Sequence, residues 1–188
     1  VENIADIDWI EANSEVEALF LEAEFIKRHK PLYNVLEKDD KNFIYIKVTV
    51  QEDFPRVTLV RRPSDDKAHY FGPFIAGFQV RQALRYMRRI FPYYSKPHTA
   101  YSSKLEYQIG VVPPPTIYIE EYRSNIRKLI LMFEGKSQYV EKQIEKDMKK
   151  LAKNKEFETA AQLRNQYLAL KGLNSKIVFG KDETFNIN

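Results

Sequence analysis

A helical segment with a polar exit carries the residues of this sequence that could do chemistry. It runs from Glu17 to Asn34, is acidic along the helix and finishes with Lys30-Pro31-Leu32-Tyr33-Asn34. A hard divalent cation such as Mg²⁺ binds through one or two carboxylates, keeps several waters and stabilises the charge that develops on a phosphodiester. One carboxylate of this helix is therefore a candidate ligand for a divalent cation, although a lone helical glutamate is usually a solvated surface residue.

A second group of residues could contact phosphate. Four arginines lie on the polar side of a predicted helix whose apolar side carries Val80, Leu84 and Met87, and three more lie nearby in the sequence. Guanidinium groups match phosphate geometry and would supply sequence-independent, salt-sensitive affinity. The alternative is a solvated amphipathic helix with ordinary surface ion pairs. The candidate DNA-binding residues are Arg56, Arg61, Arg62, Arg81, Arg85, Arg88 and Arg89.

The acidic helix is predicted over residues 15–29, after a strand over residues 5–12. Ser14 can cap this helix, and Glu17, three positions on, completes a capping box. Pro31 ends the helix, because a proline disfavours helical backbone angles at the residue before it. Apolar residues fall on two faces of the helix, which predicts neighbours on both sides.

The following region predicts a small α/β unit. Alternating apolar residues over 44–50 and 57–59 indicate two strands of a hairpin. The sequence Tyr70-Phe71-Gly72-Pro73-Phe74 predicts a tight turn whose rings pack into their own core rather than stack on bases. A helix with a single apolar stripe from Val80 to Phe91 completes the unit.

The C-terminal part predicts three helices, over residues 118–133, 136–153 and 156–173, with the last two forming an antiparallel hairpin. Such a hairpin buries little surface alone, so it is either a bundle element or a docking module that another hairpin completes. The expected seam sets Val140, Ile144, Met148 and Leu151 against Phe157, Ala160, Ala161 and Leu168.

Composition limits the classes of protein that this sequence can encode. The chain has 188 residues, 44% of them hydrophobic, and 30 Lys+Arg against 26 Asp+Glu give a net charge of +4. The absence of cysteine excludes disulfides, thiolate zinc sites and iron–sulfur clusters. No apolar run approaches the roughly 20 residues of a membrane helix. We expect a globular, cytoplasmic protein.

Four segments, in order, resemble the UvrC family of excinucleases, which act in bacterial nucleotide excision repair. The most specific are the Lys30-Pro31-Leu32-Tyr33-Asn34 exit and the Tyr70-Phe71-Gly72-Pro73 sequence. A third, Glu156-Phe157-Glu158-Thr159-Ala160-Ala161-Gln162-Leu163-Arg164, is similar to the UVR motif. The remaining segment is Tyr45 to Thr49 with Phe54-Pro55-Arg56. The shared order argues against chance agreement.

The resemblance implies an α+β fold: a truncated GIY-YIG-like α/β unit, a small α/β unit and a C-terminal helical hairpin. The later half of the nuclease domain would occupy residues 1–36 and a middle domain residues 42–95. A Pro-rich linker over 96–117 would lead to a helical region over 118–173, with the UVR-like hairpin at 137–172. Residues 174–188 would be a tail or the start of a further domain.

The resemblance also implies roles for single residues. The family's metal-binding glutamate lies four positions before an Ile-Lys pair, which here makes it Glu22, and the late asparagine is Asn34. Asn34 could equally be a turn residue after a proline. In the family the UVR hairpin pairs with the helicase UvrB, and the candidate contacts are Phe157, Ala160, Ala161, Leu163 and Arg164.

Departures from the family pattern leave two main hypotheses. The GIY and YIG strands would lie upstream of Val1, and the cysteines common in relatives around residues 94–112 are missing, which rules out a metal cluster there. The chain is then either part of a nuclease that cuts damaged DNA on the 3′ side with Mg²⁺, or a non-catalytic DNA- and partner-binding module. A regulator whose hairpin serves an unrelated partner would fit the C-terminal half alone.

Overall fold

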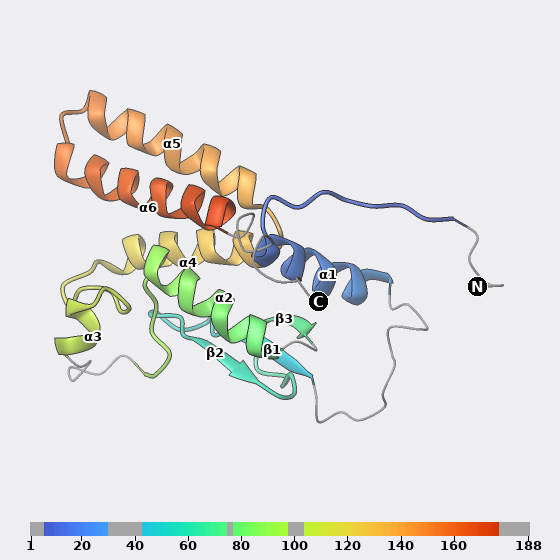
Figure 1. Cartoon of the computed structure of the whole chain (residues 1–188). Coiled ribbons are helices and arrows are strands. Elements are labelled where there is room, and N and C mark those ends of the chain that lie inside the picture. Colours follow the sequence, from blue (N-terminus) through green and yellow to red (C-terminus); the bar gives the residue numbers. More distant parts are fainter. Residues whose placement is uncertain (1–5, 30–42, 75–76, 98–103, 177–188) are drawn as a thin grey trace, which may run out of the picture.

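The computed structural model describes residues 6–29, 43–74, 77–97 and 104–176 of the chain (Figure 1). Within these ranges, a three-stranded antiparallel sheet is combined with six helices. The predicted α+β class is therefore confirmed. In Figure 1 the sheet lies at the bottom, and the hairpin of α5 and α6 lies at the top, farthest from it.

The first helix, α1 (Glu15–His29), has the predicted bounds. Its cap is half of the predicted capping box, because the Ser14 hydroxyl accepts a hydrogen bond from the Glu17 N–H at 3.1 Å. The Glu17 carboxylate accepts from the backbone N–H of Asn13 at 2.7 Å instead of from Ser14. The strand expected over residues 5–12 is wrong for the described residues 6–12, which are extended but pair with no strand in the described chain.

The sheet has the order β2-β1-β3 and is antiparallel throughout. Strands β1 (Ile44–Val48) and β2 (Val57–Val60) confirm the predicted hairpin, with Ile46 opposite Leu59. The alternation of β1 is also confirmed, since Ile44, Ile46 and Val48 are buried while the residues between them are half-buried. One face of the sheet thus joins the core.

The tight turn expected at residues 70–74 is wrong, because these residues form strand β3 (His69–Phe74) on the other side of β1. The pairing shifts between Ile44 and Ile46, and Gly72 nearby has a φ of +119°. Such a conformation favours glycine and is typical of a β-bulge. Phe71 and Phe74 do pack into the core, as expected.

Helix α2 (Gly77–Ile90) presents its predicted apolar stripe to the core, with Val80, Leu84 and Met87 buried. The region expected to be irregular contains the short helix α3 (Lys104–Gln108). The Pro-rich stretch after it turns back on itself, since the Ile117 N–H donates to the Pro114 carbonyl at 3.0 Å.

Helices α4 (Ile119–Phe133), α5 (Ser137–Lys153) and α6 (Phe157–Lys176) confirm the three predicted helices, and α5 and α6 lie side by side as an antiparallel hairpin (Figure 1). Both connecting turns are Schellman motifs. In the first, Gly135 has a φ of +71°, and in the second, Lys155 has a φ of +64°. The N–H groups of Lys136 and Glu156 donate back to Leu131 and Leu151, at 2.9 and 3.0 Å.

The predicted seam of the hairpin is half right. On α5, Val140 and Ile144 are fully buried, as expected. On α6, Ala160 is buried, but Phe157 and Leu168 are 67% and 58% exposed. The residues of α6 that pack in the core lie instead on a neighbouring face of the helix. They are Leu163, Tyr167 and Leu170.

The buried side chains form one cluster, from Val16 to Leu170. Residues of α1, the sheet, α2, α4, α5 and α6 contribute to it. At its centre, the Phe20 ring lies 6.0 Å from that of Phe74 and 5.1 Å from that of Phe133, both edge-on. Three distant parts of the sequence therefore share one aromatic contact. The division of the chain into domains stays a prediction.

Tyr122 connects α4 to the β1–β2 turn. Its hydroxyl donates to the carbonyl of Pro55 and accepts from the N–H of Tyr94 at 3.2 Å. The residue is completely buried, and burial raises the pKa of its hydroxyl above the usual value.

Candidate functional site

Glu22, the predicted metal ligand, lies exposed on α1 between two surface grooves. The extended segment before α1 forms the other wall of the first groove, through Asp8 and Trp9, and His29 closes one end. Helix α2 forms the far wall of the second groove, through Gln79, Gln82 and Tyr86. The carboxylate is thus open to solvent on both sides, so that a cation bound to it could also contact a phosphodiester.

The fit of a divalent cation at Glu22 depends on a single described carboxylate. Within the described ranges, no three His, Asp or Glu side chains are grouped so that they could hold a metal ion. A magnesium ion commonly keeps several waters and takes only one or two protein carboxylates, with substrate phosphate supplying further oxygens. Glu22 is compatible with that type of site. Asn34, the other predicted catalytic residue, lies outside the described residues.

The structure separates the predicted DNA-binding arginines into two kinds. Arg81, Arg85 and Arg89 are exposed on α2 and form one surface, and Arg61 and Arg62 are exposed just after β2. The other two hold the fold together. The sequence pattern could not separate the two kinds, because both occupy polar positions.

Arg88 is one of these structural arginines. Its Nε donates to the carbonyl of Val111 at 2.8 Å and to that of Tyr93 at 3.2 Å, and its guanidinium lies 5.2 Å from the centre of the Tyr93 ring. Arg88 thus fastens α2 to the segment before α4. A contact with phosphate would have to compete with these bonds.

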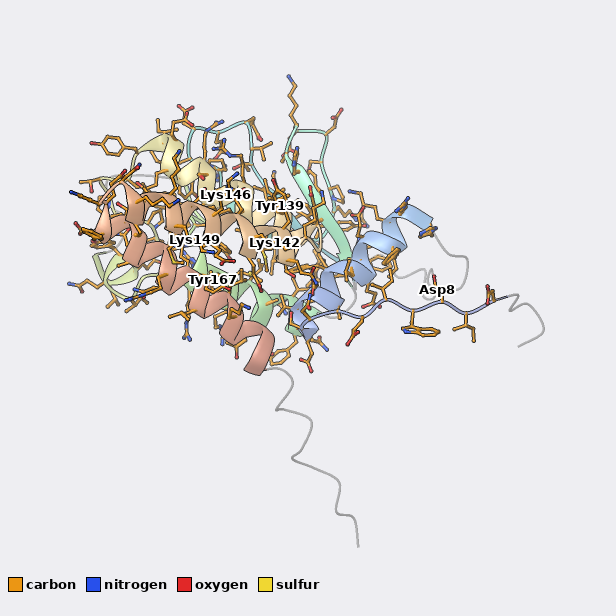
Figure 2. The ribbon with its side chains drawn as sticks, turned by 90° about the horizontal axis from the view of Figure 1, so that it is seen from above. Asp8, Tyr139, Lys142, Lys146, Lys149 and Tyr167 are labelled. Atoms are coloured by element: carbon orange, nitrogen blue, oxygen red, sulfur yellow. The ribbon has the colours of Figure 1, made fainter. Side chains whose placement is uncertain are left out.

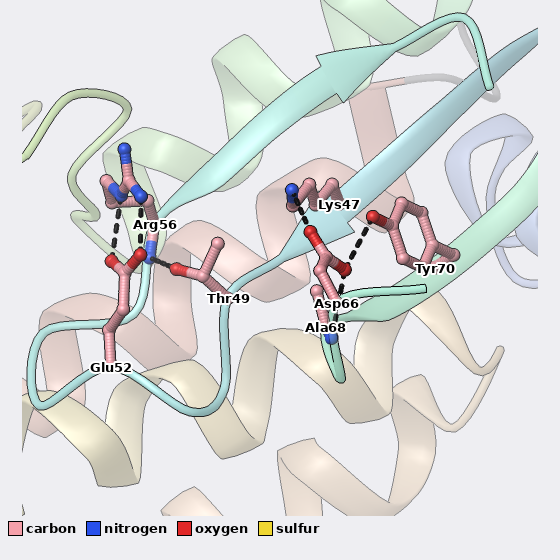
Figure 3. Close-up of polar contacts among 7 residues, drawn as sticks. All are labelled: Lys47, Thr49, Glu52, Arg56, Asp66, Ala68 and Tyr70. Carbon is pink, nitrogen blue, oxygen red and sulfur yellow. Dashed lines mark hydrogen bonds and ion pairs between the residues drawn. The ribbon is translucent and has the colours of Figure 1, made fainter. Parts of the chain in front are cut away.

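Arg56 is the other structural arginine, and Figure 3 shows its surroundings. Its guanidinium forms a two-bond ion pair with Glu52, and its backbone N–H donates to the Thr49 hydroxyl at 2.8 Å. The hydrogen bond from Arg56 holds the pKa of Glu52 below its usual value. These contacts fix the turn between β1 and β2.

Figure 3 also shows a set of polar contacts around Asp66 that the sequence did not predict. The Asp66 carboxylate accepts hydrogen bonds from Lys47 of β1 and, at 2.8 Å, from the Tyr70 hydroxyl of β3. The bond from Lys47, and then the bond from Tyr70, hold the pKa of Asp66 below its usual value. No periodicity connects these residues, because Asp66 lies in the loop between β2 and β3 and meets β1 only in the folded sheet.

The predicted partner-binding residues of α6 do not share one face. Ala160 is buried against the hairpin, and Ala161 and Leu163 are half-buried. Phe157 and Arg164 are exposed. Phe157 and Leu168 therefore remain as large apolar side chains on the solvent side of α6, in a position to meet another helix.

The sequence pattern missed the contact that joins the predicted nuclease segment to the hairpin. The carboxylate of Glu17, only 6% exposed, accepts a hydrogen bond from the hydroxyl of Ser137, the first residue of α5. One turn along α1, a Cβ at Gly135 would come within 2.6 Å of the Leu21 side chain. The turn between α4 and α5 thus rests directly on α1.

Two family models match parts of the chain. The family model for the UvrC-like GIY-YIG domain matches residues 1–35, and that for the UvrB/uvrC motif matches residues 140–173, which cover most of α5 and α6. No solved structure matches the chain significantly. None of the helices in the described ranges is long and apolar enough to cross a membrane.

Proteins named UvrABC system protein C match nearly the whole chain. The one from Thermoanaerobacter sp. (strain X514) is 37% identical over 96% of the chain, and the one from Clostridium botulinum (strain Hall) is 38% identical over 94%. The one from Synechocystis sp. (strain PCC 6803) is 37% identical over 93%. The chain spans less than a third of the length of these curated relatives, 31%, 30% and 29% in the same order.

Proposed function

We propose that the chain acts in bacterial nucleotide excision repair, because it is related to UvrABC system protein C along nearly its whole length. In this role it docks on the helicase UvrB through α5 and α6 and contributes Glu22 to metal-dependent incision of damaged DNA on the 3′ side of the lesion. The proposal assigns related roles to α1 and to the hairpin, which the Glu17–Ser137 hydrogen bond joins.

The observation that carries the docking role is the exposed apolar side of α6. Phe157 is 67% and Leu168 58% exposed, on a hairpin whose opposite side is already buried against α4 and α2. A partner hairpin would cover these side chains and complete a helical bundle. Large aromatic side chains of this kind often dominate the energy of an interface.

The incision role is supported by the accessible position of Glu22. A divalent cation bound there would stabilise the charge that develops on the phosphodiester. The chain itself supplies the carboxylate that binds the cation and, on α2, the exposed guanidinium groups of Arg81, Arg85 and Arg89 to hold the DNA backbone. Asn34 stays a proposed catalytic residue.

Calorimetric titration of the chain with the C-terminal hairpin of UvrB tests the docking role. We expect binding by the wild type and a loss of at least tenfold in affinity for Phe157→Ala, as for an interface hot spot. Gln162→Ala, a change at an exposed polar position of the same helix, serves as the matched control and should bind as the wild type does. Absence of wild-type binding would contradict the proposal.

The alternative function is a DNA- and partner-binding module that cuts nothing, and the exposed side of α6 supports it equally well. Incision of a lesion-containing duplex, with the other components of a UvrABC system present, distinguishes the two. If the chain supplies the metal ligand, Glu22→Gln abolishes Mg²⁺-dependent incision, while Glu24→Gln, an exposed position of the same helix, preserves it. If the wild type supports no incision, or if neither variant changes it, the binding module is the correct description.

A further inference from the structure

The outer side of α5 carries a dense set of positive charges that neither the docking helix nor the predicted nuclease segment uses. Five lysines lie within twelve residues of α5 and line a single shallow depression of the surface. We call this surface the lysine face, and it consists of Lys142, Lys146, Lys149, Lys150 and Lys153.

The lysine face is opposite the buried side of α5. Val140 and Ile144 are fully buried, and at about 100° per residue the lysines fall on the other side of the helix, where all five are exposed. Figure 2, which looks down on the hairpin, shows Lys142, Lys146 and Lys149 along α5 together with Tyr139. Tyr139 is 58% exposed and adds an aromatic ring at the start of the row.

The charges of this surface are poorly balanced. Glu145 and Asp147 line the same depression, so five lysines meet two carboxylates, an excess of three compared with an excess of four for the whole chain. Glu145 pairs with Lys149 at 2.6 Å, and Asp147 accepts from Gln143 at 3.0 Å. Among the described residues, Lys142, Lys146, Lys150 and Lys153 have no carboxylate within ion-pair distance.

We propose that the lysine face binds the phosphate backbone of duplex DNA. Apart from the adjacent Lys149 and Lys150, the lysines succeed one another every three or four residues over roughly 16 Å of helix. DNA carries its charges as a regular row, so several ammonium groups can each meet a phosphate without reading sequence. The inference rests on the proposed repair function, which supplies DNA as the polyanion, and it adds a contact surface to the candidate arginines of α2.

The two helices of the hairpin then have different partners. The exposed Phe157 and Leu168 belong to α6, whereas the lysine face belongs to α5, so a helical partner on α6 leaves the lysines accessible. Docking through one helix would hold the other against the DNA on which the partner is bound. In the assembled complex, this arrangement would set the orientation of the chain on the DNA.

The test measures binding of the full chain to a fluorescent duplex by anisotropy at several KCl concentrations. Each phosphate contact contributes about 0.9 to the slope of log affinity against log salt. Lys146→Gln with Lys150→Gln should therefore reduce the slope by about 1.8. Glutamine keeps helix propensity and most of the side-chain length, and thermal melting confirms that the variant is folded.

The matched control removes the same charge elsewhere. Lys67→Gln with Lys96→Gln changes two exposed lysines in loops away from α5 and should leave the slope as in the wild type. If both double variants give the same slope, the inference is wrong. That result, combined with a reduced slope for Arg81→Gln with Arg85→Gln, would leave the proposed DNA role standing.

The other possible partner of the lysine face is an acidic protein surface. In that case Lys146→Gln with Lys150→Gln would weaken binding to the UvrB hairpin and leave the salt dependence of DNA binding unchanged, which would overturn the inference. If the wild type binds no duplex at all, the inference also fails, while the calorimetric titration with UvrB continues to test the repair function independently.

Discussion

Ser137 donates a hydrogen bond to the carboxylate of Glu17 across 120 residues of sequence. The same carboxylate accepts two bonds from Asn13, both at 2.7 Å, so that it satisfies groups at the N-terminal ends of two helices. A negative charge at these ends is favourable, because the free N–H groups of a first turn carry partial positive charge. The contact physically joins the segment matched by the nuclease model to the hairpin.

We expect Glu17→Ala to lower the free energy of unfolding by roughly 2–4 kcal/mol, since it leaves the buried hydroxyl of Ser137 and the N–H of Asn13 without an acceptor. Chemical denaturation monitored by circular dichroism measures the change. Glu24→Ala removes an exposed carboxylate from the same helix and should cost less than about 0.5 kcal/mol. Equal effects of the two changes would contradict this account of Glu17.

The turn of the α5–α6 hairpin contains a residue with a strained backbone, and a substitution can remove this strain. Lys155 is a lysine with a φ of +64°, a conformation that glycine adopts without steric cost. Lys155→Gly should stabilise the chain by about 1 kcal/mol, measured as an increase in the free energy of unfolding. Lys153→Gly, inside the last turn of α5, should have the opposite sign and a similar size.

Burial of Tyr93 makes the fold sensitive to alkaline conditions. Burial raises the pKa of this side chain to about 12, and its hydroxyl donates to the carbonyl of Leu84 at 3.3 Å. Because the side chain ionises near pH 10 in the unfolded state, the contribution of Tyr93 to the free energy of unfolding is fully present below that pH. It is lost as the pH rises toward the pKa of the folded state.

Between these two pKa values, the unfolded state releases the proton of Tyr93 and the native state does not. Each pH unit of this window should cost the wild type up to about 1.4 kcal/mol more than Tyr93→Phe, which has no ionisable group at the site. Urea titrations of both proteins at pH 9, 10 and 11 measure the difference. Parallel declines of the two proteins would show that Tyr93 is not responsible.

Two leucines of α6 should differ in how much their truncation destabilises the fold. Leu170 is fully buried, so Leu170→Ala should lower the free energy of unfolding by about 2–5 kcal/mol through lost burial and a residual cavity. Leu168 is 58% exposed, so Leu168→Ala should change stability by less than about 0.5 kcal/mol. Thermal and urea unfolding of both variants provide the comparison, and similar losses would place the seam on the wrong face.

Periodicity in the sequence was sufficient to predict the β1–β2 hairpin and all the described helices except the short α3. It failed where a partner far along the chain decides the structure. Residues 6–12 alternate in polarity but form no strand in the described chain, because alternation creates no hydrogen bonds without a neighbouring strand. Strand β3 was mistaken for a turn because Gly72 and Pro73 usually interrupt strands, whereas a bulge at an edge strand accommodates both.

The candidate site was predictable only as far as the family resemblance extends. Glu22 was found through its distance from Ile26 and Lys27, and its position on a helix follows from the capping pattern around Ser14. The exposed or buried state of each α6 residue was not predictable, since a helix with apolar residues nearly all around has no preferred side until it packs. The second acceptor role of Glu17 depends on a contact that no local pattern encodes.

The edge-on contact of Phe20 with Phe133 has a consequence for the synthesis of the chain. Ribosomes add about 5–20 residues per second, and Phe133 follows Phe20 by roughly 110 residues. The apolar side of α1 therefore waits on the order of ten seconds for its partner on α4. During that time part of the apolar side of α1 is uncovered, and a chaperone that holds it would act on residues 15–29 before any of the hairpin has been made.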